Sequence, residues 1–309
     1  TVSYSPESAG AEENWHLDLE YKALKWRIRY WHNDADFYDL FGPTERARAG
    51  DAVIAGYRHS FVYDPPRKLE LSVEVGHYMG LDRLPAAQEV ATQFSSLTSF
   101  NAELQFEDTA RSLGAVDHEK GVRWNVALGA DYAGSKVYPS ARIGFDIGAP
   151  LPIRNSSAWL YTSAGATAGS SASPLGSSYF GAFGNNYVDD REIKRYREHH
   201  SLPGFEINEI SARRFVKAVA EWNLPPMRFE DVGAPGLFLS SARPAVFAGV
   251  LAADPAAGSM KTYQTIGAQL DWFFTAAHRL PMVLSVGYAE GFEDGDRKGG
   301  EVLLSLRIM

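Results

Sequence analysis

The densest group of side chains that could do chemistry consists of Asp189, Asp190, Glu198, His199 and His200. A histidine oriented by a carboxylate is the general base of many hydrolases. Such an enzyme also needs a nucleophile beside that base, and the chain contains no Gly-x-Ser-x-Gly elbow, HExxH motif or phosphate-binding loop. A charged, solvated loop explains the cluster better. The sequence therefore predicts neither an enzyme activity nor a cofactor.

A second candidate site is a short segment rich in side-chain oxygens, of the kind that calcium prefers as ligands. Its members are Asn33, Asp34, Asp36 and Asp39. The segment lacks the glycine and the terminal glutamate that an EF-hand loop places at fixed positions. Asparagine and aspartate are also common in plain turns, so a polar turn is the better interpretation. No metal site is predicted.

Charge and composition exclude several classes of protein. The 309 residues carry a formal net charge of −8, whereas a general nucleic-acid binder usually has a basic face. The absence of cysteine excludes disulfides and thiol catalysis. No apolar run reaches the roughly 18 residues that a transmembrane helix needs. Residue 1 does not begin a signal peptide, so we expect either a mature exported protein or a domain of a longer one with further domains upstream.

Apolar and polar residues alternate throughout the chain, which is the pattern of half-buried β-strands. We count about thirteen such segments, most of them near the 9–11 residues that a tilted strand needs to cross a bilayer. The predicted strands are 15–21, 24–30, 52–63, 69–76, 100–106, 122–131, 141–147, 157–168, 211–222, 243–253, 263–274, 281–290 and 300–309.

The polar faces of these strands carry charges in mid-strand, and aromatic residues gather near the strand ends. A hydrated lumen and two interfacial girdles would produce both features. A soluble β-sandwich also alternates and is the alternative. We predict an all-β fold, a single closed antiparallel transmembrane barrel of about 14 strands, with 12 or 16 as the alternatives. The residues predicted to line its lumen are Arg27, Glu74, Arg123, Arg142, Lys217 and Asp271.

The last predicted strand shows most clearly which residues would face the lumen and which would face lipid. Val302, Leu304, Leu306 and Ile308 share one face, and Leu303 is the exception on the polar face. In a barrel with a polar lumen, the apolar face meets lipid.

Residues 195–233 resemble the late part of barrels in the bacterial surface-antigen superfamily of outer-membrane insertases and two-partner secretion transporters (BamA-like barrels). In that superfamily a long loop folds back into the lumen and ends in an Arg-Gly-Phe/Tyr tip. Here the tip is Leu202, Pro203, Gly204 and Phe205, with proline in place of the arginine. A Pro-Gly turn with an adjacent aromatic residue is the simpler alternative.

The superfamily's partner motif, aromatic-x-Asp, is matched by Phe247, with Gly249 in the acidic position. The charged pair that pins the loop in typical members is therefore missing, and Arg195 and Arg197 are the candidates to replace the arginine. The resemblance covers about residues 160–309. The amino-terminal half, with residues 33–50, is similar to barrels that end some long propeller-containing outer-membrane proteins.

The connection 172–209 is far longer than usual, and loops of that length are generally functional or disordered. The resemblance and the mixed charges of this loop predict that 171–209 folds inward and plugs the lumen. We expect Phe205 to pack against the wall formed by 211–222 and 243–253, near Phe247.

The resemblance implies a protein of the bacterial outer membrane that inserts or translocates polypeptides. Its implied mechanism is a weakly paired seam between the first and last strands, at which a client strand pairs by its edge. The expected partners are outer-membrane lipid, polypeptide clients and periplasmic or lipoprotein partners, with no nucleic acid. Two alternatives remain open: a plugged barrel that anchors another domain or partner complex, and a passive pore.

Overall fold

The structure is a computed structural model. It describes residues 2–4, 15–32, 50–81, 94–112, 115, 117–169, 173–183, 193–254 and 260–308. The described chain is all-β, with two single 3₁₀ turns, η1 (Pro174–Gly176) and η2 (Arg195–Arg197). None of its helical segments is long and apolar enough to cross a membrane. The predicted segment 33–39 with its acidic residues lies outside the described residues.

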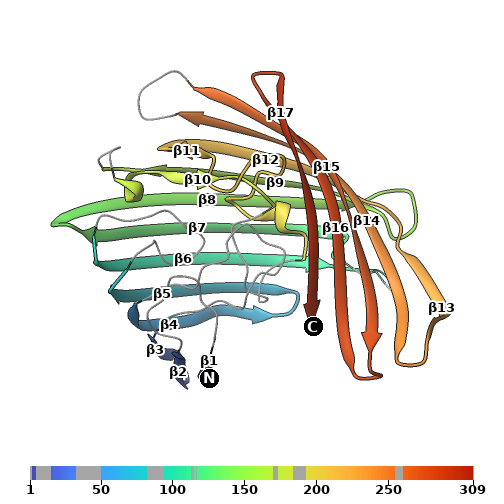
Figure 1. The fold of residues 1–309 in the computed structure, drawn as a ribbon, viewed down its shortest axis with the longest axis horizontal. Helices are drawn as coiled ribbons and strands as arrows, with labels where there is room; N and C mark the ends of the chain where they lie inside the picture. Colours follow the sequence, from blue (N-terminus) through green and yellow to red (C-terminus); the bar gives the residue numbers. More distant parts are fainter. Residues whose placement is uncertain are drawn as a thin grey trace.

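One antiparallel sheet of fifteen strands dominates the described chain (Figure 1). Its strands are β1 (Val2–Tyr4), β2 (Trp15–Ala23), β3 (Trp26–His32), β4 (Asp51–Asp64), β5 (Arg67–Met79), β6 (Ser96–Ala110), β7 (Lys120–Ala133), β8 (Lys136–Pro150), β9 (Ser157–Thr167), β12 (Arg214–Asn223), β13 (Met227–Ala234), β14 (Leu237–Asp254), β15 (Lys261–Ala276), β16 (Leu280–Glu293) and β17 (Asp296–Ile308). A second sheet pairs β10 (Ser178–Phe180) with β11 (Ile210–Ala212). Each predicted strand overlaps a strand of the main sheet, which confirms the all-β, antiparallel prediction.

Strand β13 continues β12 in the same lane of the sheet. β12 pairs with residues 245–254 of β14, and β13 pairs with residues 237–242 of the same strand. Between them lie Pro225 and Pro226, which have no backbone N–H to donate to the ladder. With β13 set aside, the other fourteen strands follow one another as hydrogen-bonded neighbours from β1 to β17.

The predicted closure is not present in the described ladders. The order runs from β1 to β17, and no described hydrogen-bonded ladder joins these two ends. Figure 1 shows the sheet strongly curved, with β4 to β8 running across the view and β14 to β17 running down it. β1 contributes only three residues, so the first edge of the sheet offers a short partner to β17. The observed architecture is a curved open sheet. The predicted closed barrel is therefore confirmed only as far as its antiparallel sheet.

The two faces of the sheet differ in chemistry. Residues paired across neighbouring strands point to the same face, so register assigns the faces without ambiguity. One row runs from Arg27 through Gly56 and Glu74 to Asn101. We call the face that carries this row the inner face, because the connection between β9 and β12 packs on it farther along the sheet. The opposite, outer face is apolar.

Large exposed apolar side chains cover the outer face, and Val302 reaches 70% exposure. Further members on successive strands are Leu19, Ile28, Val75, Phe100, Leu128, Ile143, Phe145, Val216, Ile266, Leu304, Leu306 and Ile308. Leu303 instead points to the inner face, where it is buried. The outer face thus presents to its surroundings the kind of surface that a soluble protein normally buries.

Candidate functional site

The described parts of the long connection, 173–183 and 193–209, fold onto the inner face; we call them the inner loop. They are tied to each other by backbone hydrogen bonds, including Leu202 N to the carbonyl of Ala182 at 2.8 Å and Ala182 N to that of Phe205 at 3.0 Å. Strands β10 and β11 pair at the base of the inner loop. Residues 211 and 212, predicted as part of a wall strand, therefore belong to this small sheet instead. The inner loop is an ordered unit with its own hydrogen bonds.

The tip of the inner loop, Leu202–Phe205, rests against the last strands of the sheet. The hydroxyl of Thr265 on β15 donates to the carbonyl of Pro203 at 2.5 Å. Gly204 has φ +93°, and a Cβ added there would lie 2.3 Å from the backbone N of Gly291 on β16. Glycine is therefore required at this position both by its conformation and by the close approach of a neighbouring strand.

Glu301 of β17 holds the inner loop at two points. One carboxylate oxygen accepts the backbone N–H of Gly204 at 3.0 Å, and the other accepts that of Phe183 at 3.1 Å. Hydrogen bonds to a charged acceptor are among the stronger ones in proteins. The only sequence feature that points to this role of Glu301 is its position on the polar, inward face of the last strand. The loop tip is thus fastened to the last strand of the sheet.

Phe205 packs against β12 and β14, the wall on which it was expected. It belongs to a buried cluster with Phe180, Phe215 and Leu251, and its ring centroid is 5.7 Å from that of Tyr263.

Phe247 lies in a different cluster from Phe205, contrary to expectation. Its ring stacks on Tyr196 of the inner loop with centroids 4.0 Å apart, and Phe183 meets it edge-on at 6.0 Å. Leu303 belongs to the same cluster. Phe205 packs in the cluster of Leu251, which lies four residues beyond Phe247 on β14, or about 13 Å along the strand.

Of the two candidate arginines, Arg197 is the one that pairs with the wall. Its guanidinium makes two hydrogen bonds to the carboxylate of Glu221 on β12, at 2.7 and 2.6 Å, and one to Asp117 at 3.0 Å. The side chain of Arg197 is 6% exposed and that of Glu221 0%. Arg195 lies in the same 3₁₀ turn but forms no ion pair with any described residue.

Lys194 joins the same charged cluster. Its ammonium lies 3.4 Å from Asp117 and donates to the side chain of Asn223. Burial alone would raise the pKa of Asp117, but the charges of Arg197 and Lys194 outweigh it and hold that pKa well below its usual range. The cluster therefore keeps its carboxylates charged.

A third charged wall residue, Lys217 of β12, binds the backbone of the inner loop. Its buried ammonium donates to the carbonyls of Glu198 at 2.6 Å and of Ser201 at 2.5 Å. Lys217, Glu221 and Glu301 thus project from three places on the wall and bind the loop through an amine, an ion pair and a carboxyl group.

The remaining predicted lumen residues also lie on the inner face. Arg27 pairs with Glu74 at 2.8 Å, and Arg123 pairs with Asp146 at 3.3 Å. Arg142 and Asp271 have inward positions in their ladders. Asp271 accepts hydrogen bonds from Gln269 and Ser285 at 2.7 and 2.6 Å. The structure does not bring all of them together, because they are spread over most of the sheet.

His199 of the inner loop is not a base poised for neutral pH. Burial, together with nearby positive charges such as Arg142, lowers the pKa of His199 to about 2. A general base works best with a pKa near the operating pH. Asp189 and Asp190 lie outside the described residues. Within the described chain, no group of three His, Asp or Glu residues is placed to hold a metal ion.

Comparison with protein-family models gives no match for this chain, and comparison with curated protein sequences gives none either. The sheet, the inner loop and the residues that join them are therefore the basis for assigning a function.

Proposed function

We propose that this chain is a bacterial outer-membrane β-barrel of the insertase-like superfamily. The observation that carries the proposal is the contrast between the two faces of one sheet. Apolar side chains such as Leu128, Val216 and Val302 are exposed on the outer face, whereas the inner face carries the charged residues of the strands and is partly covered by the inner loop. A soluble sandwich would need a second layer over the outer face, and no described residue supplies one.

We further propose that the sheet closes in the membrane between its first and last strands. An open edge in lipid leaves backbone N–H and C=O groups unpaired, each at a cost of several kcal/mol, so closure is favoured there. The fourteen neighbouring lanes support a barrel with an even number of strands. The seam joins β17 to the short β1 and to β2.

The activity we propose is the insertion or translocation of polypeptides, with a client strand pairing at the exposed edge of β17. Two features support a weak seam. The opposite edge, β1, has only three residues. Gly299 and Gly300 lie in the first part of β17, and glycine weakens strand pairing. Edge pairing supplies affinity through backbone hydrogen bonds whatever the client's sequence.

A plugged structural barrel that anchors another domain is the second candidate. The inner loop favours it, since Lys217, Glu221 and Glu301 all hold the loop in place. The same contacts argue against a passive pore, which needs an open lumen.

A disulfide that locks the seam between the first and last strands distinguishes the insertase from the structural anchor. The chain has no cysteine, so Leu304→Cys can be combined in turn with cysteines at 19 and 21, beyond the end of the β1 ladder, without background. In proteoliposomes, we expect oxidation to stop the assembly of an unfolded outer-membrane protein and reduction to restore it. Assembly that continues with the seam crosslinked argues for the anchor. A protein that stays soluble without detergent contradicts the membrane proposal itself.

A further inference from the structure

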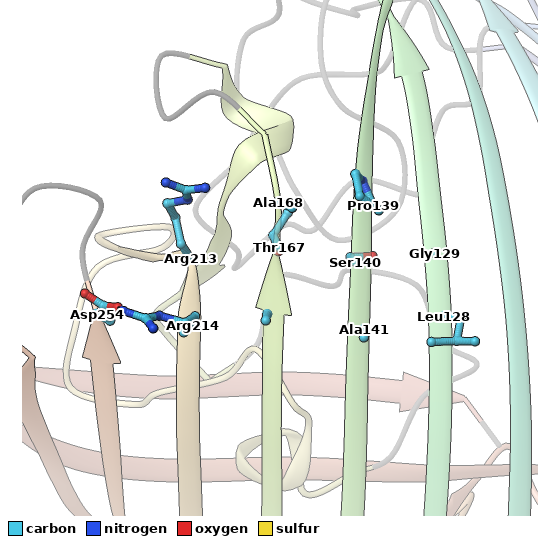
Figure 2. A pocket seen from close by; sticks show the side chains of 11 residues that line it. Leu128, Gly129, Pro139, Ser140, Ala141, Thr167, Ala168, Arg213, Arg214 and Asp254 are labelled. Atoms are coloured by element: carbon cyan, nitrogen blue, oxygen red, sulfur yellow. The ribbon is translucent and has the colours of Figure 1, made fainter.

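A hollow of about 880 Å³ opens on the sheet near the end where β9 stops and β12 begins (Figure 2). The pairing of residues between neighbouring strands shows which side chains form the floor of the hollow. Leu128, Ala141, Ala166, Arg214 and Asp254 form one outer-face row across β7, β8, β9, β12 and β14. The two alanines leave the middle of this row low, and the longer side chains of Leu128 and Arg214 stand at its sides.

Beyond the hollow, the outer face of β9 keeps the same pattern of a small residue between larger ones. Ala164, the next outer residue on that strand, is flanked in register by Ile143 on β8 and Val216 on β12. Ile143 and Val216 are 54% and 56% exposed. Small residues between apolar ridges make a lane parallel to the strands, with the width of a hydrocarbon chain.

Positive charge stands at the head of this lane. Arg214 pairs with Asp254, but its side chain is 73% exposed, and an exposed pair of this kind contributes little to stability. Arg213 lies beside it, and its Nε has no hydrogen-bond partner among the described residues. Figure 2 shows Arg213 directed past the end of β12 while Arg214 reaches toward Asp254. Two arginines and one aspartate leave one net positive charge for an anion.

We propose that the hollow binds a phosphate-bearing lipid of the outer leaflet. Its phosphate lies between the guanidinium groups of Arg213 and Arg214, which suit phosphate because they donate in a planar fork. One acyl chain lies over Ala166 and Ala164. The connections 80–95, 168–213 and 255–260 all leave the sheet at the end where the hollow lies. In such barrels the longer loops face the cell exterior, so this end of the sheet lies in the outer leaflet. This inference rests on the proposed function, since it requires the outer face to meet lipid.

The test uses the full chain in neutral detergent and lipid A as the probe, compared with enzymatically dephosphorylated lipid A, which has the same acyl chains. Native mass spectrometry measures the bound fraction. We expect the phosphorylated form to bind about ten-fold or more tightly, as for the loss of one hydrogen bond to a charged group. The double variant Arg213→Gln, Arg214→Gln should lose this preference, and Ala166→Leu should weaken both forms by filling the lane.

Matched controls lie elsewhere on the sheet. Arg67→Gln removes an exposed arginine that pairs with Asp108 at the opposite end, and Ala55→Leu enlarges an outer-face alanine on β4. Both should bind lipid A as the unchanged chain does. Equal binding of the two lipid forms by the unchanged chain overturns the inference, as does binding of inorganic phosphate with the affinity of lipid A. A chain that enters bilayers yet shows no phosphate preference contradicts this inference alone; failure to enter bilayers contradicts the proposed function.

Discussion

The inner face of the sheet has two regions built on the same alternation but with different interiors. On β3 to β5, Arg27 and Glu74 pair across β4 while remaining 34% and 40% exposed. On β9 to β17, the inner loop covers the face, and Arg197 pairs with a Glu221 side chain that is 0% exposed. An exposed pair is screened by water, whereas breaking a buried one leaves a charge without a partner. Charges of the same type thus have different energetic weight in the two regions.

The largest difference is expected when one arginine is removed from each region. Arg197→Met leaves the buried carboxylate of Glu221 and the half-buried one of Asp117 without their guanidinium, and we expect it to lower the free energy of unfolding by about 3–5 kcal/mol. Arg27→Met, the matched change in the exposed region, should cost about 0–1 kcal/mol. Urea unfolding in detergent measures both. Equal losses would show that the inner loop does not dehydrate its ion pairs.

Removing the aromatic ring at the loop tip should have an effect of similar size. Phe205→Ala empties a buried position, and we expect a loss of about 3–5 kcal/mol together with a rise in single-channel conductance as the loop loosens. Phe100→Ala, on the outer face of β6, is the control and should leave conductance unchanged. Unchanged conductance in both variants argues that the tip does not obstruct the lumen.

The loop-covered region should also respond to pH. The pKa of His199 is about 2 in the folded chain and about 6.5 when unfolded, so the unfolded state binds more protons as pH falls below 6.5. Stability is full above that pH and falls by up to about 1.4 kcal/mol per unit below it, or about 2 kcal/mol at pH 5. The depressed pKa of Asp117 adds a loss only below about pH 3.8.

Urea midpoints at pH 7.5 and pH 5 measure this effect. His199→Gln should flatten the dependence, and His77→Gln, an exposed position on β5, should leave it as in the unchanged chain. A change in midpoint between the two pH values that is the same in His199→Gln as in the unchanged chain contradicts the buried position of His199.

The smallest expected effect compares two glycines of similar φ. Gly236 has φ +87° in an open turn, so Gly236→Ala should cost about 1 kcal/mol for its conformation alone. Gly204 has φ +93° but lies against the backbone of β16, so Gly204→Ala should cost more. The difference between the two losses, measured by urea unfolding, reports how tightly the loop tip is seated. Equal losses would mean that the tip stands away from the wall.

Much of the strand arrangement could be predicted because a strand has a period of two. Alternation places Arg27, Lys217 and Asp271 on one face and Val302 and Leu304 on the other without knowledge of the fold. The strand ends were predicted less well: β14 extends to 18 residues, and β13 was missed because Pro225 and Pro226, just before it, interrupt the strand pattern. Closure was not predictable from alternation, which says nothing about the partner of an edge strand.

By itself, the sequence determined the strand type, the two faces and the existence of a long loop with an apolar Pro-Gly tip. Only the tertiary structure decided how the loop is held. Arg195 and Arg197 are equivalent in sequence, and only the turn of the loop directs Arg197 to Glu221. Leu303, the exception to the alternation, packs in the cluster of Tyr196 and Phe247. The physical reason is that alternation is a local property of one strand, whereas these contacts join residues far apart along the chain.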